Sequence, residues 1–339
     1  MSSVNLKRLA EELNLSIATV SRALRDSHEV SASTKKRVQE LAKALHYEPN
    51  AYASSLRRNL SNTIGVVIPK VANHFFSLAI NGIEEVARQS GYHVLIYLTH
   101  DSYEREVSII RHIRGRVDGL LMSVAAESRD FAHLQELNQH LPIVFFDRVC
   151  EEIATAKVTT NDYESGYQAT QHLLEAGCRH IAHLVISSNL SIGRNRMQGY
   201  RDALRDHGLP AEDDLILSGV MDNAQNEVLI KDLLQRRPDI DGIFASVERL
   251  ATSSYYVCQS LGRAIPEDVK IVGFSNLESV SLFNPPLSTI TQPAYEMGRK
   301  AASIMVKALD RGKMTLPDQS VVINSTLHAR QSTAVGVVK

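Results

Sequence analysis

The feature that most constrains this chain is a regular alternation of short apolar segments with longer amphipathic ones between residues 61 and 275. The apolar segments are rich in β-branched residues and start about 25 residues apart in the first half, with helical periodicity at 74–90 and 103–114. Strands that are apolar on both faces and alternate with helices indicate parallel sheets with helices on both sides. The predicted strands are 64–68, 94–97, 119–122 and 143–146 in one half, and 181–186, 215–217, 242–245 and 270–274 in the other.

Glycines follow several of the helical segments, as expected of residues that end a helix in the left-handed conformation. They are Gly91, Gly177, Gly208, Gly262 and Gly312. Because the two halves repeat one plan, the sequence predicts two α/β lobes. Open parallel sheets bind ligands beyond the carboxyl ends of their strands, so we expect a ligand cleft between the lobes.

The first 45 residues predict a small helical unit. Apolar residues in 6–13 have helical spacing and follow Asn5, a plausible N-cap. After a break at 14–16, Ser16 can cap a second short helix in which Val20, Ala23 and Leu24 face inward. Two short helices with so tight a turn suggest a helix-turn-helix unit. A third helix is expected from Ser31 or Ser33, and its basic run 35–37 is either a phosphate contact or a solvated face.

Residues 46–60 have the composition of a linker. Pro49 and Asn50 mark a helix start, and 51–58 would form about two turns. A helix that short is marginal in water, and so we expect it to become ordered against a partner helix or a DNA groove.

The net charge of −1 by itself argues against a DNA-binding protein, but the distribution of charge does not. Residues 1–60 hold 10 basic and 6 acidic side chains, whereas the remainder holds 27 basic and 32 acidic ones. A basic head on a mildly acidic body fits local contact with phosphates without general attraction to polyanions.

Several classes of protein are disfavoured. No apolar run is long enough to span a membrane, and the charged N-terminus has no signal-peptide character. Cys150, Cys178 and Cys258 are expected to be buried free thiols in a reducing cytosol. No metal-ligand spacing, phosphate-binding loop or nucleophile motif is present, so we expect neither an enzyme nor a cofactor.

From Asn5 to Leu56 the chain resembles the DNA-binding head and hinge of the lactose-repressor (LacI–GalR) family of bacterial regulators. The resemblance is carried by 9–13, Ser16, Thr19–Arg22, Val30–Ser31, Tyr47, Pro49–Asn50 and Ala53–Leu56, and it continues through the body to about residue 333.

The resemblance implies an all-α helix-turn-helix head with a hinge helix, joined to an α/β body of two parallel-sheet lobes with the periplasmic-binding-protein fold. The expected domains are 1–47 for the head, 48–60 for the hinge and 61–339 for the effector-binding and dimerisation domain. Within the body, we expect lobe one at 61–160 and 292–320 and lobe two at 161–290 and 321–339, with crossings near 160, 290 and 320.

The DNA contacts are expected on the second helix and the hinge, and the candidates for reading bases are Ile17, Ala18, Ser21 and Arg22. Arg22 can make a bidentate contact with guanine, and Ile17 and Ala18 offer apolar contact to thymine methyls. The alternative is an ordinary exposed helix start. The resemblance implies that Leu56 wedges into the minor groove, although it could instead pack one hinge helix on another. The DNA-binding candidates are Ser16, Ile17, Ala18, Thr19, Ser21, Arg22, Asn50, Ala53 and Leu56.

The effector contacts implied by the resemblance lie at strand ends and crossings. The candidates are Phe75, Phe76, Arg148, Asn161, Asp162, Arg196, Met221, Glu248, Ser275 and Gln292. Aromatic faces stack on sugar rings, and Arg and Asp bind hydroxyls or acidic groups in pairs. Plain core is the alternative for each Phe, and a surface salt bridge is the alternative for each Arg.

The chain also departs from the family pattern. Ser275 stands where an acid is usual, Met221 stands where a ring is usual, and Val247–Glu248 replaces Asn–Asp. The arginines therefore raise an acidic or phosphorylated sugar as an alternative ligand.

We expect a bacterial, cytoplasmic homodimer that regulates transcription on a pseudo-palindromic operator, as a repressor controlled by a small molecule of the sugar class. A solute-binding receptor would need an export signal and no head, and a regulator driven by a protein partner is a further alternative. The direction of the response depends on which state of the body the ligand prefers.

Overall fold

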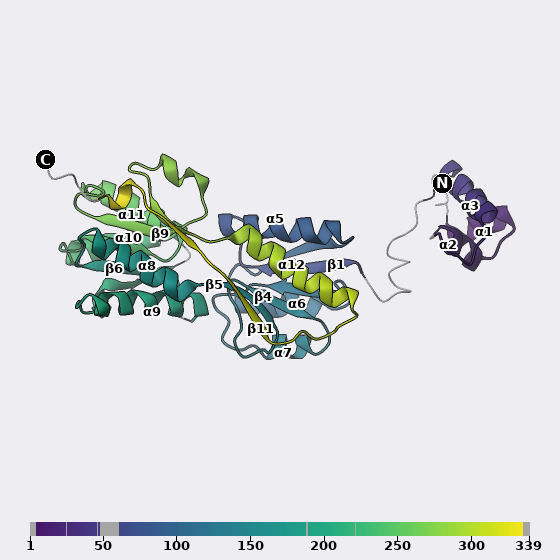
Figure 1. Cartoon of the computed structure of the whole chain (residues 1–339), viewed down its shortest axis with the longest axis horizontal. Helices are drawn as coiled ribbons and strands as arrows, with labels where there is room; N and C mark the ends of the chain where they lie inside the picture. Colours follow the sequence, from purple (N-terminus) through teal and green to yellow (C-terminus); the bar gives the residue numbers. More distant parts are fainter. Residues whose placement is uncertain are drawn as a thin grey trace. The chain divides into compact units, whose positions relative to one another are not determined.

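The computed structural model describes residues 5–24, 26–45, 47, 61–187, 189–220 and 222–334. The chain divides into two units, Met1–Ser61 and Asn62–Lys339, called the head and the body below (Figure 1). The expected hinge helix, with Asn50, Ala53 and Leu56, lies outside the described residues, as does Met221.

The head contains three helices, α1 (Leu6–Leu13), α2 (Ile17–Leu24) and α3 (Ala32–Ala44). Each begins after a predicted cap. The side chains of Asn5, Ser16 and Ser31 accept hydrogen bonds from backbone N–H groups three residues later, at 3.0, 3.0 and 3.3 Å. Leu9, Val20, Ala23 and Val38 are fully buried and form the centre of the head's core.

Lobe one of the body is a parallel six-stranded sheet in the order β11-β5-β4-β3-β1-β2. Alternate residues of one strand enter different cores: Ile64, Val66 and Ile68 pack under α5 and α12, whereas Val67 packs under α6 and α7. This explains the continuous apolar runs, because both faces of the sheet are covered. The strands are β1 (Thr63–Ile68), β2 (His93–Leu98), β3 (Gly119–Met122), β4 (Ile143–Phe146), β5 (Ala156–Thr160) and β11 (Gln319–Ile323), and the helices are α5 (His74–Gln89), α6 (Tyr103–Ile113), α7 (Ala132–Asn138) and α12 (Ala294–Asp310).

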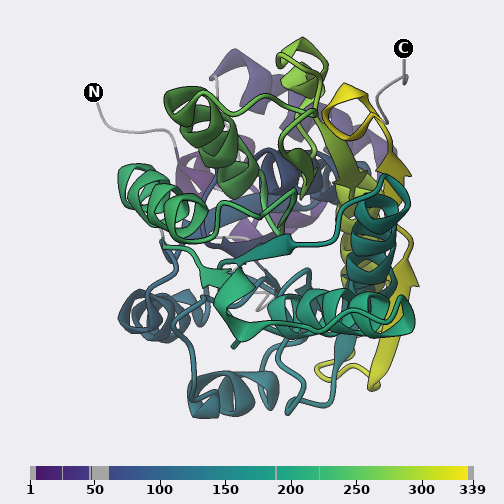
Figure 2. The same cartoon turned by 90° about the vertical axis from the view of Figure 1, so that its left-hand side faces the viewer.

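Lobe two repeats this plan in the order β12-β10-β9-β8-β6-β7, with only β12 antiparallel to its neighbour. Helices α8 and α9 cover one face of the sheet, and α10 and α11 cover the other (Figure 2). The strands are β6 (Ile181–Val185), β7 (Ile216–Ser218), β8 (Gly242–Ala245), β9 (Lys270–Phe274), β10 (Ser288–Thr291) and β12 (Thr326–His328), and the helices are α8 (Asp162–Glu175), α9 (Ser191–Asp206), α10 (Asn223–Arg236) and α11 (Glu248–Leu261).

The chain crosses between the lobes three times. The first two crossings, at 161 after β5 and at 292–293 after β10, lie where they were expected. The third lies at 324–325 rather than near 320, because β11 extends lobe one's sheet by pairing with β5 as far as Ile323 and Thr160. The chain therefore re-enters lobe two at β12 and not at residue 321.

Two helix pairs approach one another closely through glycines. In lobe one, α5 and α12 lie side by side, with Gly82 against the Tyr295 carbonyl (Figure 1). In lobe two, Gly166 of α8 lies against the Arg196 carbonyl of α9. A Cβ atom at either glycine would overlap that backbone, so both positions require glycine for packing rather than for a turn.

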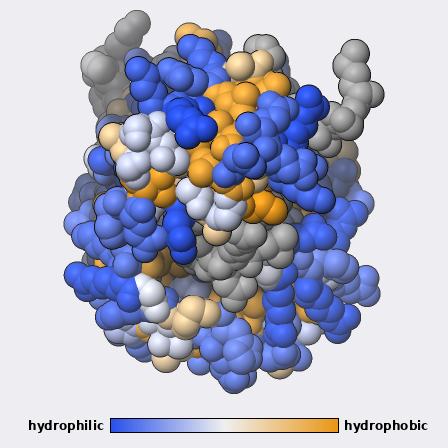
Figure 3. All heavy atoms as spheres, turned by 90° about the vertical axis from the view of Figure 1, so that its right-hand side faces the viewer, coloured by the Kyte–Doolittle hydropathy of each residue, from blue (hydrophilic) through white to orange (hydrophobic). Residues whose placement is uncertain are grey.

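The surface and the interior have the expected character. Hydrophilic residues predominate on the face drawn in Figure 3, and hydrophobic residues gather mainly in the upper middle of the view. All three cysteines are buried free thiols, as predicted. Within the described residues, none of the helices has the length and apolarity needed to cross a bilayer.

Candidate DNA-binding and effector sites

Helix α2 presents most of the predicted DNA-contacting residues on the side away from the head's core. Ser16, Ile17, Ala18 and Arg22 are exposed, and Thr19 and Ser21 are partly buried. Val20 and Ala23 anchor the opposite side of the helix. Exposed apolar residues beside an exposed arginine form a surface that can enter a major groove, where thymine methyls and guanine acceptors alternate.

The basic run at the start of α3 is not uniformly available to phosphate. The Lys35 ammonium donates to the Asp26 carboxylate at 2.7 Å and to the Asp26 carbonyl at 3.1 Å. Lys36 and Arg37 are exposed. Lys35 is therefore held by the turn between α2 and α3. Lys36 and Arg37 are better placed to contact the phosphate backbone of DNA.

In the body, most of the predicted effector residues gather where the two lobes meet. Phe75 and Phe76 begin α5, with the Asn73 side chain accepting the Phe75 N–H at 2.9 Å. Phe76 is almost fully buried and packs edge-on against Phe146 at 6.4 Å between ring centroids. Both phenylalanines belong to lobe one's core. Phe76 therefore fits the alternative in which the phenylalanine is a core residue and not a ligand contact. Phe75 is slightly more exposed than Phe76.

The two candidate arginines are buried, so the alternative of a surface salt bridge is wrong for both. In lobe one, the Arg148 guanidinium contacts the Asp101 carboxylate at 2.5 Å and Asp147 at 3.9 Å. In lobe two, Arg196 donates to Asp162 through Nε at 2.8 Å and to the Ser246 carbonyl at 2.6 Å. A buried ion pair of this kind needs such added hydrogen bonds to offset the loss of hydration.

Arg196 is also stacked on an aromatic ring. Its Cζ lies 3.6 Å from the centroid of Phe274, at the end of β9. With Asp162, the Ser246 carbonyl and Phe274 around it, the guanidinium is fixed on three sides. Such a group is preorganised and can bind a ligand without first being ordered.

Asp147 is a buried residue of the lobe junction that was not among the predicted effector candidates. It follows β4, is buried, and has a positive φ of 60°. Burial raises the pKa of its carboxyl to about 6, against the opposing effect of Arg148 and Arg196. The sequence did offer a signal for Asp147: it directly precedes the candidate Arg148, and both residues follow the end of β4.

Glu248 and Ser275 occupy adjoining positions in lobe two. The Ser275 hydroxyl donates to the Glu248 carboxylate at 3.0 Å, and burial raises the pKa of Glu248. The opposing influence of His74 on that pKa comes from lobe one, across the junction. The family pattern places an acid at the position of Ser275. In this chain Ser275 instead donates to an acid from another element, Glu248 of α11.

Two further residues join the lobes. Gln292, at the second crossing, donates to the Thr160 hydroxyl at 3.4 Å and also bonds Asp147. Burial lowers the pKa of Arg249 in α11, and Asp101 of lobe one opposes that shift. Apolar contact adds to these, because Leu190 and Ile192 of lobe two pack into a core of lobe one.

The chemistry available at the junction is recognition by hydrogen bonds and charge. Carboxylates, guanidiniums and hydroxyls lie beside one another, partly buried, as in sites that orient a polar ligand. No group of His, Cys, Asp and Glu that could hold a metal ion occurs within the described part of the chain.

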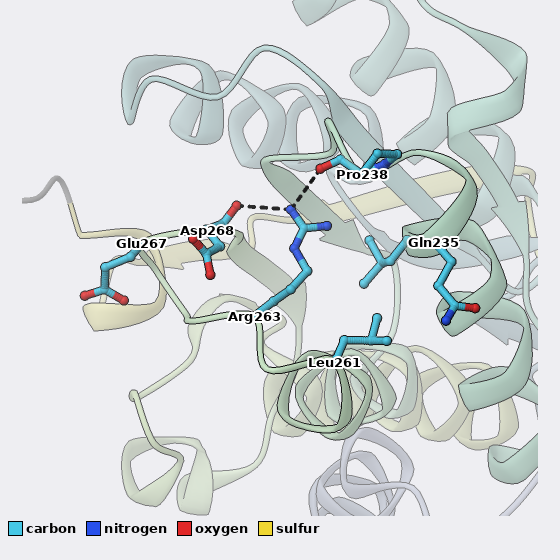
Figure 4. Close-up of a pocket in the computed structure, with 7 residues that line it drawn as sticks. Gln235, Pro238, Leu261, Arg263, Glu267 and Asp268 are labelled. Atoms are coloured by element: carbon cyan, nitrogen blue, oxygen red, sulfur yellow. Dashed lines mark hydrogen bonds between the residues drawn. The ribbon is translucent and has the colours of Figure 1, made fainter.

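A separate hollow lies in lobe two, in the loops after α10 and α11 (Figure 4). Arg263 reaches across it, and its Nη2 donates to the carbonyls of Pro238, Ile240 and Asp268 at 3.4, 2.6 and 3.4 Å. This arginine ties the loop between α10 and β8 to the loop between α11 and β9. None of the predicted effector residues lines this hollow.

Two family profiles match the chain. The profile described as "Bacterial regulatory proteins, lacI family" matches residues 5–50. The profile described as "Periplasmic binding proteins and sugar binding domain of LacI family" matches residues 61–329, well over half of the chain. The chain therefore belongs to the LacI family of bacterial regulatory proteins. It is a DNA-binding transcription regulator with an effector-binding body, and the predicted fold class is confirmed for the helix-turn-helix head and the two-lobed α/β body.

Individual relatives agree with this assignment. The HTH-type transcriptional repressor PurR of Aliivibrio fischeri (strain MJ11) is 30% identical over 309 residues, which cover 90% of this chain and 91% of the relative. A transcriptional regulator CelR–cellobiose complex is similar at 26% identity with a TM-score of 0.73, covering 97% and 100%. The lac repressor dimer bound to operator and the anti-inducer ONPF shares the fold with a TM-score of 0.83 at 21% identity, covering 98% and 99%.

Proposed function

We propose that this regulator is a homodimeric repressor whose operator affinity is set by a neutral, polyhydroxylated sugar bound between the lobes of the body. The observation that carries the proposal is the buried Arg196, fixed by Asp162, the Ser246 carbonyl and the Phe274 ring at the carboxyl end of lobe two's sheet. A preorganised donor beside an aromatic face suits a ring that carries hydroxyls.

The charges at the junction favour a neutral ligand over an acidic one. Arg148 contacts Asp101, and Arg196 contacts Asp162, so the two arginines that suggested an acidic sugar are already neutralised. An added carboxylate or phosphate would approach Asp147 and Glu248 as well. The CelR structure, solved with cellobiose, gives a similar regulator with a neutral sugar.

On DNA, we propose that α2 reads base edges through Arg22, with Ile17 and Ala18 against thymine methyls. Ser21 would also face the bases. Ser16 and Thr19 would contact phosphates, and the segment with Asn50, Ala53 and Leu56 would bind the minor groove between two half-sites. The exposure of Arg22, Ile17 and Ala18 on one side of α2 supports the first part of this assignment.

The homodimer is supported by exposed apolar side chains at one edge of lobe one. Leu95 and Ile96 lie on β2, the outermost strand of its sheet, and are 40% and 39% exposed. A free edge strand that carries large apolar residues is a ready pairing surface. The lac repressor, with the same fold, was solved as a dimer on operator. A bacterial regulator of this kind would act in the cytoplasm, without catalysis and without a cofactor.

The effector proposal is tested by calorimetry of the full chain with neutral sugars, uronic acids and sugar phosphates. Arg196→Lys keeps the charge opposite Asp162 but loses the planar fork. It should weaken binding of the effector about tenfold or more, since the ligand loses the hydrogen bonds that the buried planar guanidinium donates. Arg201→Lys, on the same helix but partly exposed and paired with Asp213, should leave binding unchanged.

Two results would contradict the proposal. Binding restricted to acidic sugars would show that the paired arginines still select charge. Absence of binding to every sugar, together with operator binding that requires a protein partner, would favour the partner-driven alternative.

A further inference from the structure

The turn between α2 and α3 brings an acidic side chain against the proposed base-reading arginine. Glu29 forms an ion pair with Arg22, with 3.0 Å between Oε2 and Nε. The two side chains are 54% and 53% exposed, so the pair lies at the surface that faces solvent. An exposed ion pair contributes little to stability, so the Glu29–Arg22 pair is not explained by a need to stabilise the head.

The backbone on both sides of this pair is fixed. The Ser27 N–H donates to the Arg22 carbonyl at 3.0 Å, and the Glu29 N–H donates to the Ser27 hydroxyl at 3.4 Å. Val30, the next residue, is buried in the head's core. Glu29 therefore projects from an anchored turn, and its carboxylate approaches Arg22 without a long segment having to become ordered.

The side of the guanidinium that the carboxylate occupies matters for base reading. Guanine presents O6 and N7 to a bidentate donor in the major groove. A carboxylate at Nε takes one edge of the planar group and leaves the edge formed by the two terminal nitrogens for the base. It also limits rotation of a long side chain that would otherwise have to be ordered on binding.

We propose that Glu29 is a positioning residue that sets the guanidinium of Arg22 for guanine, and thereby contributes to operator specificity. This inference rests on the proposed role of Arg22. With the head on DNA, the same negative charge would also repel the phosphate backbone and weaken binding to every sequence alike. Glu29 thus has two separable effects, one on the ratio of specific to non-specific affinity and one on affinity in general.

Asp26 provides a matched control. It is an acid in the same turn, it is exposed, and it pairs with Lys35 at 2.7 Å instead of with Arg22. Asp26→Asn and Glu29→Gln each remove one negative charge from the same turn, and both changes are nearly isosteric. The general charge effect should therefore be shared by the two variants, whereas any effect that acts through Arg22 should occur only with Glu29→Gln.

The experiment uses the full chain, the duplex that the unaltered protein selects from a random pool, and a scrambled duplex of equal length. We expect both charge variants to bind the scrambled duplex more tightly by a similar factor. Glu29→Gln alone should lower the ratio of specific to scrambled affinity, by about three- to tenfold for a contact of this size. In the Arg22→Ala background, Glu29→Gln should not change the ratio further.

The outcomes separate this inference from the proposed function. If Arg22→Ala lowers the ratio but Glu29→Gln matches Asp26→Asn, Arg22 reads bases and the role of Glu29 is refuted. If Glu29→Gln raises the ratio, the pair holds Arg22 away from DNA, and the positioning role is again refuted. If Arg22→Ala leaves the ratio unchanged, both assignments are wrong. Thermal melting of each variant identifies any loss that comes from unfolding.

Discussion

Asp147 illustrates how a single buried residue at the lobe junction links protonation to stability. Its carboxyl is surrounded by groups of both charges, and burial prevails over the nearby guanidiniums. A carboxyl whose pKa is raised in the folded state binds its proton more tightly there than in the unfolded chain. Its contribution to stability is therefore full below the unfolded pKa of 3.8 and is lost as pH rises through about 6.

We expect Asp147→Asn to raise the free energy of unfolding at pH 7 to 8, by on the order of 2–3 kcal/mol, and to change it little at pH 4. Asparagine tolerates the positive φ at this position, so the backbone need not move. Denaturant unfolding of the full chain across pH 4 to 8 measures the effect. A uniform change at every pH would refute the assignment of the raised pKa.

Asp239→Asn is the control with the opposite sign. The Arg237 guanidinium lowers the pKa of Asp239 to about 2, so the stability from this group is present above 3.8 and is lost in acid. Asp239→Asn should therefore lower the free energy of unfolding only at the higher pH values. The fall in the free energy of unfolding between pH 4 and 6, which is due to Asp147, should remain in this variant.

At the scale of elements, the paired helices α8 and α9 position Asp162 and Arg196, two of the proposed effector residues. Gly166 lies against the backbone carbonyl of Arg196, one helix across. The distance between the two helices is set by the absence of a Cβ, and Arg196 can reach Asp162 at the start of α8 only at that distance. The geometry of the site thus depends on a residue that contacts no ligand.

Replacing Gly166 with alanine should destabilise the chain by about 1–3 kcal/mol through overpacking, although alanine is intrinsically the better helix former. Affinity for the effector should also fall, because Arg196 is displaced. Thermal melting and calorimetry measure the two effects.

Gly82→Ala in the α5–α12 pair is the matched control. It creates a similar overlap with the Tyr295 carbonyl, far from Arg196 along the chain and in the other lobe. It should reduce stability while sparing effector affinity. Equal losses of affinity in both variants would show that the glycine contact has no special bearing on the site.

The sequence predicted the elements that follow a single physical pattern. Strands β1, β3, β4, β6, β8 and β9 were found because they are apolar on both faces. Strand β5 was not, because Ala156–Thr160 contains a lysine and two threonines, and its place inside the sheet comes from pairing with β4 on one side and the distant β11 on the other. Local periodicity cannot show a pairing between residues so far apart in the chain.

The residues of the candidate site were also predicted only in part. Arg148, Asp162 and Arg196 were identified from the family resemblance, and the structure adds the partners that the pattern could not supply. Asp101 follows β2 and reaches Arg148 from another loop, and Phe274 lies beneath Arg196 from the end of β9. Such contacts depend on the tertiary arrangement of strand ends and have no signature in the sequence.

For the whole molecule, the two edges of lobe one's sheet differ in their expected role. Strand β2 carries Leu95 and Ile96, the proposed dimer surface, and β11 carries Val322, which is 55% exposed. Ile96→Lys should weaken the dimer about tenfold or more, since a charge would be buried at the interface, whereas Val322→Lys should not. Sedimentation equilibrium measures both, and equal dissociation by the two variants would place the interface elsewhere.

The three crossings between the lobes also bear on how the chain acquires its structure during synthesis. Neither lobe is continuous: β11 completes the first sheet beside β5, and β12 completes the second beside β10. While the ribosome is still adding residues before 319, both sheets lack an edge strand, and β5 exposes a side that has no partner. Unpaired edges of that kind promote aggregation of nascent chains. We therefore expect the body to become protease-resistant late and in one step, after residue 328 has left the exit tunnel, rather than lobe by lobe.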